Sequence, residues 1–156
     1  MPSTTRRPST GPDRRAAVRQ QILEATERLL VGGASFTELG VQRIAAEAGL
    51  ARSTFYLHFR DKTEIITQLA GDLGGGSFNM MSSWDPLGTE PVESLTRALE
   101  AIIAFYRERA HLLAAVIEVA AYDPIAREAW DKTLEAFVEL GRGWLKIGRA
   151  SCRERV

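Results

Sequence analysis

Apolar residues recur at helical spacing in three separate stretches of the first 62 residues. Positions three or four apart lie on one face of a helix. In the first stretch, which begins at Asp13 and stops at Gly32 and Gly33, these positions are Val18, Ile22, Ala25 and Leu29, with Leu30 beside them. In the second they are Val41, Ile44, Ala45 and Ala48, and in the third, from Arg52 to Phe59, they are Phe55 and Phe59. The pattern predicts three helices.

A turn separates the second and third of these helices. Gly49 stands where a helix commonly ends in a left-handed residue, and Leu50 is the apolar residue that packs back under such an end. A helix, a glycine-containing turn and a second short helix are typical of a helix-turn-helix, whose second helix lies in a major groove of DNA. Polar or amphipathic side chains point away from the buried face of the two helices: Gln42, Arg52, Ser53, Thr54, Tyr56 and His58.

A fourth helix is predicted after Phe59, and its length is ambiguous. Asp61 and Glu64 stand three apart ahead of an apolar run, which is a variant of the capping box. The buried stripe of this helix is Ile65, Ile66, Leu69 and Leu73. Glycines at positions 71, 74, 75 and 76 would each cost about 1 kcal/mol inside a helix, which argues for a break near 74–76. A phosphate-binding glycine loop is disfavoured because no Gly-Lys-Ser/Thr follows.

The remaining pattern is also helical. Residues 84–90 contain Asp85, Pro86 and Gly88 and are expected to form a loop. Three helices are predicted after it, from Pro91 to about Arg109, from His111 to Tyr122, and from Pro124 toward Leu145. The predicted fold class is all-α, with antiparallel helices after the N-terminal three.

Charge is distributed unevenly although the formal net charge is zero. Residues 1–62 carry ten Lys and Arg against six acids, and residues 63–146 carry seven against thirteen. A basic N-terminal part and an acidic C-terminal part fit a domain that binds phosphates joined to a domain with a different function.

Residues 1–12 are poor in apolar residues and are expected to be a flexible basic arm. Arg6, Arg7, Arg14 and Arg15 would reach a minor groove or phosphates, with a solubilising tail as an equal alternative. No apolar run can span a bilayer and no signal peptide is present, so a cytoplasmic protein is expected.

The helix-turn-helix residues resemble the signature of the TetR family of bacterial regulators. The matching positions are Ala45, Gly49, Leu50, Ala51, Thr54, Phe55, Tyr56, His58, Phe59 and Lys62. Ala51 departs from the family pattern, which has Ser there, so the recognition helix lacks a side-chain N-cap worth about 1 kcal/mol. The resemblance implies that Arg52, Ser53 and Thr54 meet bases and nearby phosphates and that Tyr56, His58 and Lys62 meet phosphates. Gln42, outward on the preceding helix, is a further candidate for a base contact. The alternative for each single residue is a solvated or packing role.

The resemblance also implies a three-helix DNA-binding domain over residues 13–62 and an incomplete effector-binding and dimerisation bundle over residues 63–146. It favours a fourth helix that continues toward Ser82. The expected partners are double-stranded operator DNA, a small apolar effector and a second copy of the full-length chain, with no cofactor and no metal. Aromatic and aliphatic side chains suited to line an effector pocket are Phe105, Tyr106, Ile117, Tyr122, Trp130, Phe137 and Trp144. Plain core packing is the alternative for each of them.

Residues 147–156 depart from the helical pattern and match the translation of one reading frame of a common sequencing adapter. We expect this tail to be non-native, which removes the only cysteine, Cys152, from any redox or metal argument. The chain is then expected to stop before the last two helices of the family, which leaves apolar surface exposed.

The resemblance implies a repressor that a small-molecule effector releases from a palindromic operator, and two other functional classes are the alternatives. An enzyme is disfavoured because the sequence offers few candidate catalytic residues. Its histidines are only His58 and His111, and no nucleophile elbow is recognisable. Glu108 and His111 have the spacing of a carboxylate-bridged metal helix, but the second pair that a di-metal site needs is missing from the sequence. A helical interaction protein without DNA binding would tolerate neutralisation of Arg52 and Lys62.

Overall fold

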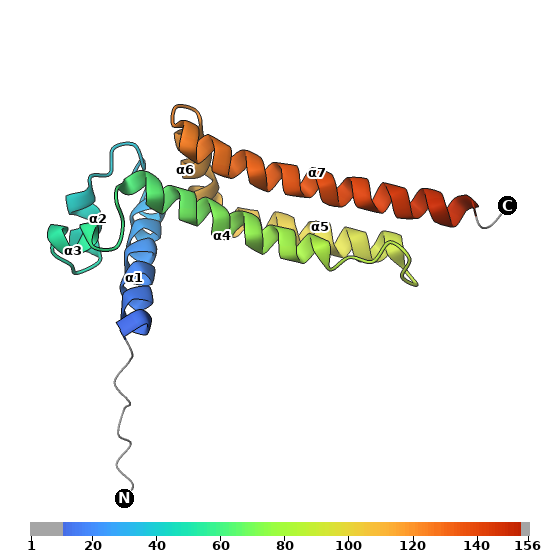
Figure 1. The fold of residues 1–156 in the computed structure, drawn as a ribbon, viewed down its shortest axis with the longest axis horizontal. Coiled ribbons are helices and arrows are strands. Elements are labelled where there is room, and N and C mark those ends of the chain that lie inside the picture. Colours follow the sequence, from blue (N-terminus) through green and yellow to red (C-terminus); the bar gives the residue numbers. More distant parts are fainter. Residues whose placement is uncertain (1–10, 154–156) are drawn as a thin grey trace, which may run out of the picture. The chain divides into compact units, whose positions relative to one another are not determined.

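The computed structural model describes residues 11–153, with side chains described up to residue 148. Within that part the regular structure is entirely helical (Figure 1). Its helices are α1 (Gly11–Val31), α2 (Val41–Glu47), α3 (Arg52–Tyr56), α4 (Lys62–Ser82), α5 (Pro91–Glu108), α6 (Ala110–Ala120) and α7 (Pro124–Arg153). The predicted all-α fold class is confirmed. Most of the predicted basic arm lies outside the described residues, but Gly11 and Pro12 already belong to α1.

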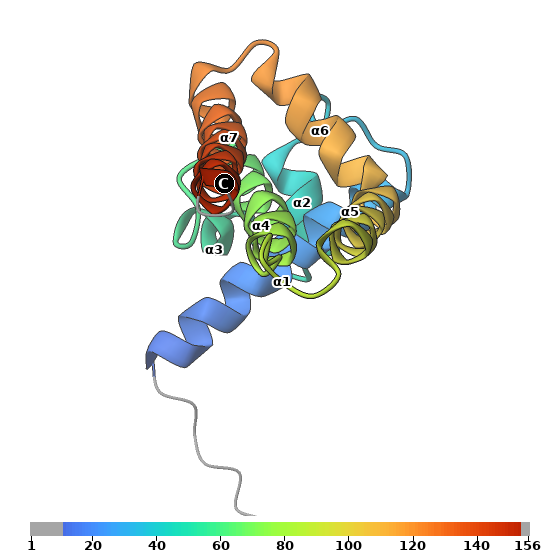
Figure 2. The same cartoon turned by 90° about the vertical axis from the view of Figure 1, so that its right-hand side faces the viewer.

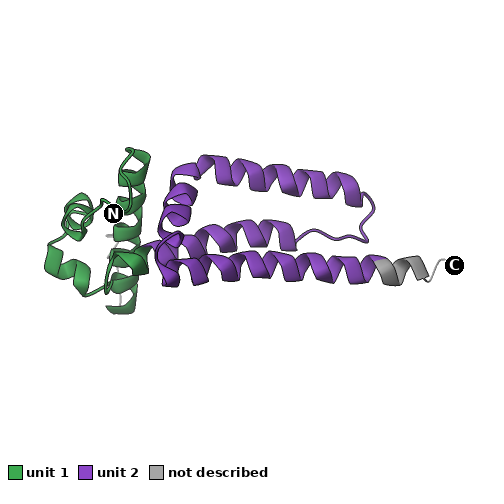
Figure 3. Cartoon of the chain, turned by 90° about the horizontal axis from the view of Figure 1, so that it is seen from above, with its two compact units in different colours: residues 1–65 green, residues 66–156 purple. Residues whose placement is uncertain are grey.

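The chain divides into two compact units, residues 1–65 and residues 66–156 (Figure 3). The boundary falls inside α4, whereas the resemblance implied a boundary after residue 62. No helix of the described residues is long and apolar enough to cross a membrane.

Unit 1 has a core to which each of its helices contributes. The large side chains buried there are Ile22, Leu23, Leu30, Phe36, Leu39, Ile44, Phe55, Phe59 and Ile65. Burying each of them contributes about 1.5–3 kcal/mol. On α1 the buried face is turned slightly from the predicted stripe, because Leu23 and Thr26 are buried while Val18 and Leu29 are only half-buried. The Thr26 hydroxyl donates to the carbonyl of Ile22 at 2.9 Å, so its burial leaves no unpaired donor.

The turn between α2 and α3 is the one that the sequence predicts. Gly49 has a φ of +68°, which a residue with a Cβ adopts only at a cost. The N–H of Leu50 donates to the carbonyl of Ala45 at 2.8 Å, and the N–H of Gly49 donates to Ala46 at 3.0 Å. These two bonds are the Schellman pattern, which satisfies carbonyls at the end of α2 and fixes where the chain leaves it.

The predicted capping box at the start of α4 is confirmed with a shift of one residue. The Asp61 carboxylate accepts from the N–H of Glu64 at 2.9 Å, and the Glu64 carboxylate reaches back to the N–H of Arg60 at 2.8 Å. Burial alone would raise the pKa of Asp61, but the donated N–H of Glu64 and the guanidinium of Arg60 outweigh it and lower that pKa. The first turn of α4 is therefore well determined.

Helix α4 continues unbroken through its glycines to Ser82, so the break argued from helix propensity is wrong. Its glycines serve close packing within unit 2. A Cβ added at Gly74 would lie 2.4 Å from Cγ2 of Thr133 on α7, and one at Gly76 would lie 2.8 Å from the ring of Phe105 on α5. Figure 2 shows α4 between α5 and α7. Packing on two sides thus outweighs the roughly 1 kcal/mol that each glycine costs a helix.

The rest of unit 2 follows the predicted order of elements. The loop after α4 is fixed by Trp84, whose indole N–H donates to the carbonyl of Pro91 at 2.9 Å and whose ring lies 4.7 Å from that of Trp144. Leu112, Val116 and Val119 of α6 are buried. Helix α7 runs on to Arg153, so the expectation that residues 147–156 leave the helical pattern is wrong as far as that residue.

Candidate nucleic-acid interface

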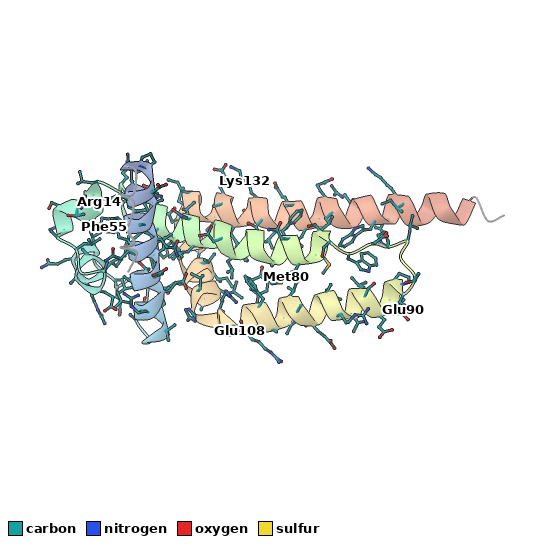
Figure 4. All side chains as sticks on the ribbon, turned by 90° about the horizontal axis from the view of Figure 1, so that it is seen from below. Arg14, Phe55, Met80, Glu90, Glu108 and Lys132 are labelled. Atoms are coloured by element: carbon teal, nitrogen blue, oxygen red, sulfur yellow. The ribbon has the colours of Figure 1, made fainter. Side chains whose placement is uncertain are left out.

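The inward face of the helix-turn-helix is anchored by two phenylalanines. Phe55 is 0% exposed and Phe59 is 1% exposed, and their ring centroids are 5.9 Å apart. Figure 4 shows Phe55 among the N-terminal helices. The ring of Tyr56 meets Phe55 edge to face at 5.4 Å. Because α3 is one and a half turns long, these anchors fix which of its side chains face solvent.

The outward face carries the residues predicted to meet DNA. Gln42 on α2 and Arg52 and Ser53 on α3 are exposed, Tyr56 is 47% exposed, and Thr54 is half-buried. The Arg52 guanidinium lies 5.8 Å from the Tyr56 ring centre. Its Nη2 lies 3.5 Å from the Tyr56 hydroxyl, which places its fork of donors beside the tyrosine. The structure therefore gathers Gln42, Arg52, Ser53 and Tyr56 on exposed positions of two consecutive helices.

The start of α3 has the defect that the sequence predicts. Ala51 is the N-cap residue and provides no side-chain hydrogen bond to the first turn. The N–H groups of that turn lack the oxygen that a serine would supply.

Side chains of α1 bind backbone carbonyls at the C-terminal ends of α2 and α3. These contacts were not predicted from the sequence. Gln21 donates to the carbonyl of Ala48 at 2.5 Å, and Arg28 donates to the carbonyl of Glu47 at 3.3 Å and to its carboxylate at 2.9 Å. Both contacts satisfy orphan carbonyls where the dipole of α2 is negative. The sequence signal for these contacts was a pair of polar side chains seven residues apart on α1. An analysis of apolar spacing alone does not detect such a pair.

Arg19 performs the same task at the end of α3. Its guanidinium donates to the carbonyl of His58, binds the Glu64 carboxylate at 3.2 Å and lies 4.0 Å from the centre of the Phe59 ring. One α1 side chain thus joins the residues after α3 to the first turn of α4. Arg15, expected in the DNA-reaching arm, is exposed and has Nη2 at 3.4 Å from the carbonyl of Leu57.

His58 lies partly inside unit 1. Its Nδ1 is buried and has no hydrogen-bond partner among the described atoms. Burial, followed by the charges of Arg15 and Arg19, lowers the pKa of the imidazole. The neutral form is therefore favoured, and the predicted phosphate contact of His58 stays a prediction.

Lys62 also turns toward protein. Its Nζ donates to the carbonyl oxygens of Phe36 at 3.2 Å, Thr37 at 2.6 Å and Leu39 at 3.2 Å. The ammonium lies 5.5 Å from the Phe36 ring centre. Of the predicted phosphate contacts, Tyr56 is exposed, whereas His58 and Lys62 are half-buried.

The helix-turn-helix lies within a stretch that matches a known family. Residues 22–69 match the family model of bacterial regulatory proteins of the tetR family. These residues form a DNA-binding domain of the TetR family. The match covers the second half of α1, the whole helix-turn-helix and the first turns of α4. Proteins of this family are DNA-binding transcriptional regulators, which supports DNA as a partner of this chain.

The side chains predicted for an effector pocket make separate contacts within the part of unit 2 that the structure describes. On α5, Phe105 packs on Gly76, and the Tyr106 hydroxyl lies 2.9 Å from the buried Ser77 hydroxyl. On α7, Phe137 meets Phe78 edge to face, and Trp144 meets Trp84. Ile117 and Tyr122 are 54% and 55% exposed, and Trp130 is half-buried. These seven residues stay a prediction for effector binding.

A different set of residues lines an apolar hollow in unit 2. Its volume is about 250 Å³, and it lies between α4 and α7. Its lining residues are Gly74, Gly75, Phe78, Lys132, Thr133 and Ala136. The signal that the sequence offered was the glycine run, which was first taken as evidence for a helix break.

Proposed function

We propose that this chain is a repressor that binds a palindromic operator as a homodimer and leaves it when a small apolar effector binds. The observation that carries the proposal is the outward set on α2 and α3, held in place by buried Phe55 and Phe59. In a dimer, two such sets read half-sites one helical turn, roughly 34 Å, apart.

The outward residues divide by chemistry. Arg52 can donate two hydrogen bonds to a guanine edge, and Gln42 can make the matching pair with adenine. Ser53, Thr54 and Tyr56 carry hydroxyl groups that suit phosphate oxygens, which position the protein without reading sequence. Base reading is therefore assigned to Gln42 and Arg52.

The effector is proposed to enter the hollow beside Gly75. Apolar walls and a small volume favour a small, uncharged, apolar compound. Because α4 forms one wall and also begins in unit 1, a compound that favours another placement of this helix would shift the population of DNA-competent chains. The coupling is reciprocal, so operator DNA weakens effector binding by the same factor.

The DNA reading is tested by selecting duplexes from a random pool with the full chain. Affinity for the selected duplex and for a random duplex of equal length is then measured at two salt concentrations. We expect the selected duplex to bind at least about 10³-fold more tightly and to be palindromic. Arg52→Ala should remove much of this preference, whereas Arg97→Ala, an exposed arginine of α5, should leave it intact. Equal binding of both duplexes would contradict the proposal.

The effector step is tested by screening small apolar compounds for those that release the selected duplex. A side chain added at Gly75 meets open space, so Gly75→Leu fills the hollow without a clash at its Cβ. Compounds that release the wild-type chain should fail to release Gly75→Leu. If both chains respond equally, the effector binds elsewhere.

A further inference from the structure

Lys62 is the first residue of α4, and its ammonium group is enclosed by backbone oxygens. The three bonds to Phe36, Thr37 and Leu39 use three N–H donors, which is all that a lysine side chain has. Hydrogen bonds from a charged donor are stronger than neutral ones. A phosphate could be bound by Nζ only if at least one of these bonds were given up.

The segment that Lys62 holds sets the start of α2. Phe36 and Leu39 are each 1% exposed, so both ends of this segment are anchored in the core of unit 1. Gly40, the next residue, is the N-cap of α2 and has no side-chain cap. Its carbonyl accepts from the N–H of Arg43 at 3.0 Å. Gln42 therefore stands on a helix whose first turn is placed by the segment that Lys62 grips.

The same turn of α4 reaches the other helix of the motif. Glu64, two residues after Lys62, binds Arg19, and Arg19 donates to the carbonyl of His58 just beyond α3. The first turn of α4 thus holds α2 through Lys62 and α3 through Glu64 and Arg19. All of these contacts lie within residues 1–65.

We propose that Lys62 is a positioning residue for DNA recognition, which fixes α2 against α4 through its three carbonyl bonds and makes no phosphate contact. The proposal rests on the DNA-binding function proposed above. It gives Lys62 and Arg52 different roles, although both are cations close to the helix-turn-helix. Arg52 acts on DNA directly, whereas Lys62 acts through the placement of Gln42.

The test compares Lys62→Met with Arg52→Met and with Arg97→Met as a control on α5. Each full chain is measured on a duplex selected by the wild-type chain and on a random duplex, over a salt series, at a temperature where all variants are folded. A lost phosphate contact lowers the slope of log affinity against log salt by about 0.9, and therefore by about 1.8 when both protomers of the proposed dimer lose it. For Lys62→Met we expect less than half of that change, with a roughly tenfold loss of preference for the selected duplex. Its unfolding midpoint should fall by roughly 5 °C, because bonds made by a charged group are lost.

Lys62→Arg separates charge from geometry. It retains the positive charge, but its planar fork cannot point three donors at one set of converging carbonyls. A positioning residue predicts that Lys62→Arg loses preference for the selected duplex, whereas a phosphate contact predicts near wild-type binding. Wild-type behaviour of Lys62→Arg would therefore overturn the proposal.

The remaining outcomes of these measurements also test the proposal. A full loss of one phosphate contact in the salt slope of Lys62→Met overturns the proposal, and so does a lowered unfolding midpoint with unchanged preference, which would mark a purely structural residue. If the wild-type chain selects no duplex, the operator proposal fails separately. The unfolding midpoint alone then tests whether Lys62 binds the three carbonyls, and an unchanged unfolding midpoint for Lys62→Met would contradict those contacts.

Discussion

Gly74 of α4 and Thr133 of α7 approach so closely that a methyl group on the glycine would lie 2.4 Å from Cγ2 of the threonine. Thr133 is β-branched and short, so it cannot swing aside at low cost. We expect Gly74→Ala to destabilise the chain by about 1–3 kcal/mol, the usual cost of an overpacked contact. Urea unfolding monitored by circular dichroism measures it.

Gly71→Ala is the matched control for that substitution. Gly71 lies in the same helix, and a Cβ there meets nothing within 4 Å. Alanine should stabilise α4 at this position by about 0.5–1 kcal/mol through helix propensity. Equal effects of the two substitutions would show that α4 and α7 are not packed as closely as described.

The exposed N-cap of α3 offers a stabilising substitution. Ala51 has φ −69° and ψ 147°, which is the extended conformation of an N-cap residue. Ala51→Ser should add a hydrogen bond to the first turn and raise the free energy of unfolding by about 0.5–1 kcal/mol. Ala51→Val, which supplies no oxygen, is the comparison, and a serine variant no more stable than wild type would argue against an uncapped helix.

The contacts of Arg19 predict a coupling that a double-mutant cycle measures. Arg19→Met and Glu64→Gln each break the 3.2 Å ion pair, whose side chains are 29% and 37% exposed. Because the pair is partly exposed, we expect an interaction energy of only about 0.5–1 kcal/mol. Arg97→Met with Glu93→Gln, a more exposed pair on α5, should give less. A cycle at Arg19 and Glu64 that shows no coupling would remove this link between α1 and α4.

The depressed pKa of His58 predicts a pH-dependent stability. Burial, Arg15 and Arg19 lower it below the ordinary value of 6.5, so between the two values the unfolded chain binds more protons than the folded chain. Stability from this group is complete above about pH 6.5 and is lost as pH falls through the folded pKa. Urea unfolding at pH 7.5 and pH 5.5 should show a larger loss for wild type than for His58→Gln. An equal loss in both chains would place the titration on another group.

Local signals predicted the parts of this fold that depend on neighbouring residues. The Gly49 turn, the Asp61 and Glu64 cap and the buried Phe55 and Phe59 each follow from spacing along a few residues, because the atoms that meet are close in sequence. The continuity of α4 could not be derived from propensity, since it depends on Phe105 and Thr133, which are distant in sequence from the glycines they contact. The candidate site divides in the same way. Outward Arg52 could be predicted from helix geometry, but the inward turn of Lys62 depends on carbonyls more than twenty residues earlier.

The supports of the helix-turn-helix have a consequence for how its sequence preference can change. Gln21, Arg28 and Lys62 hold backbone carbonyls, whereas Gln42 and Arg52 hold none among the contacts described. The side chains that support the motif are therefore different from those proposed to contact bases. Substitutions at Gln42 and Arg52 can alter which bases are preferred while the motif stays folded, so related chains can diverge in target without first gaining stability elsewhere.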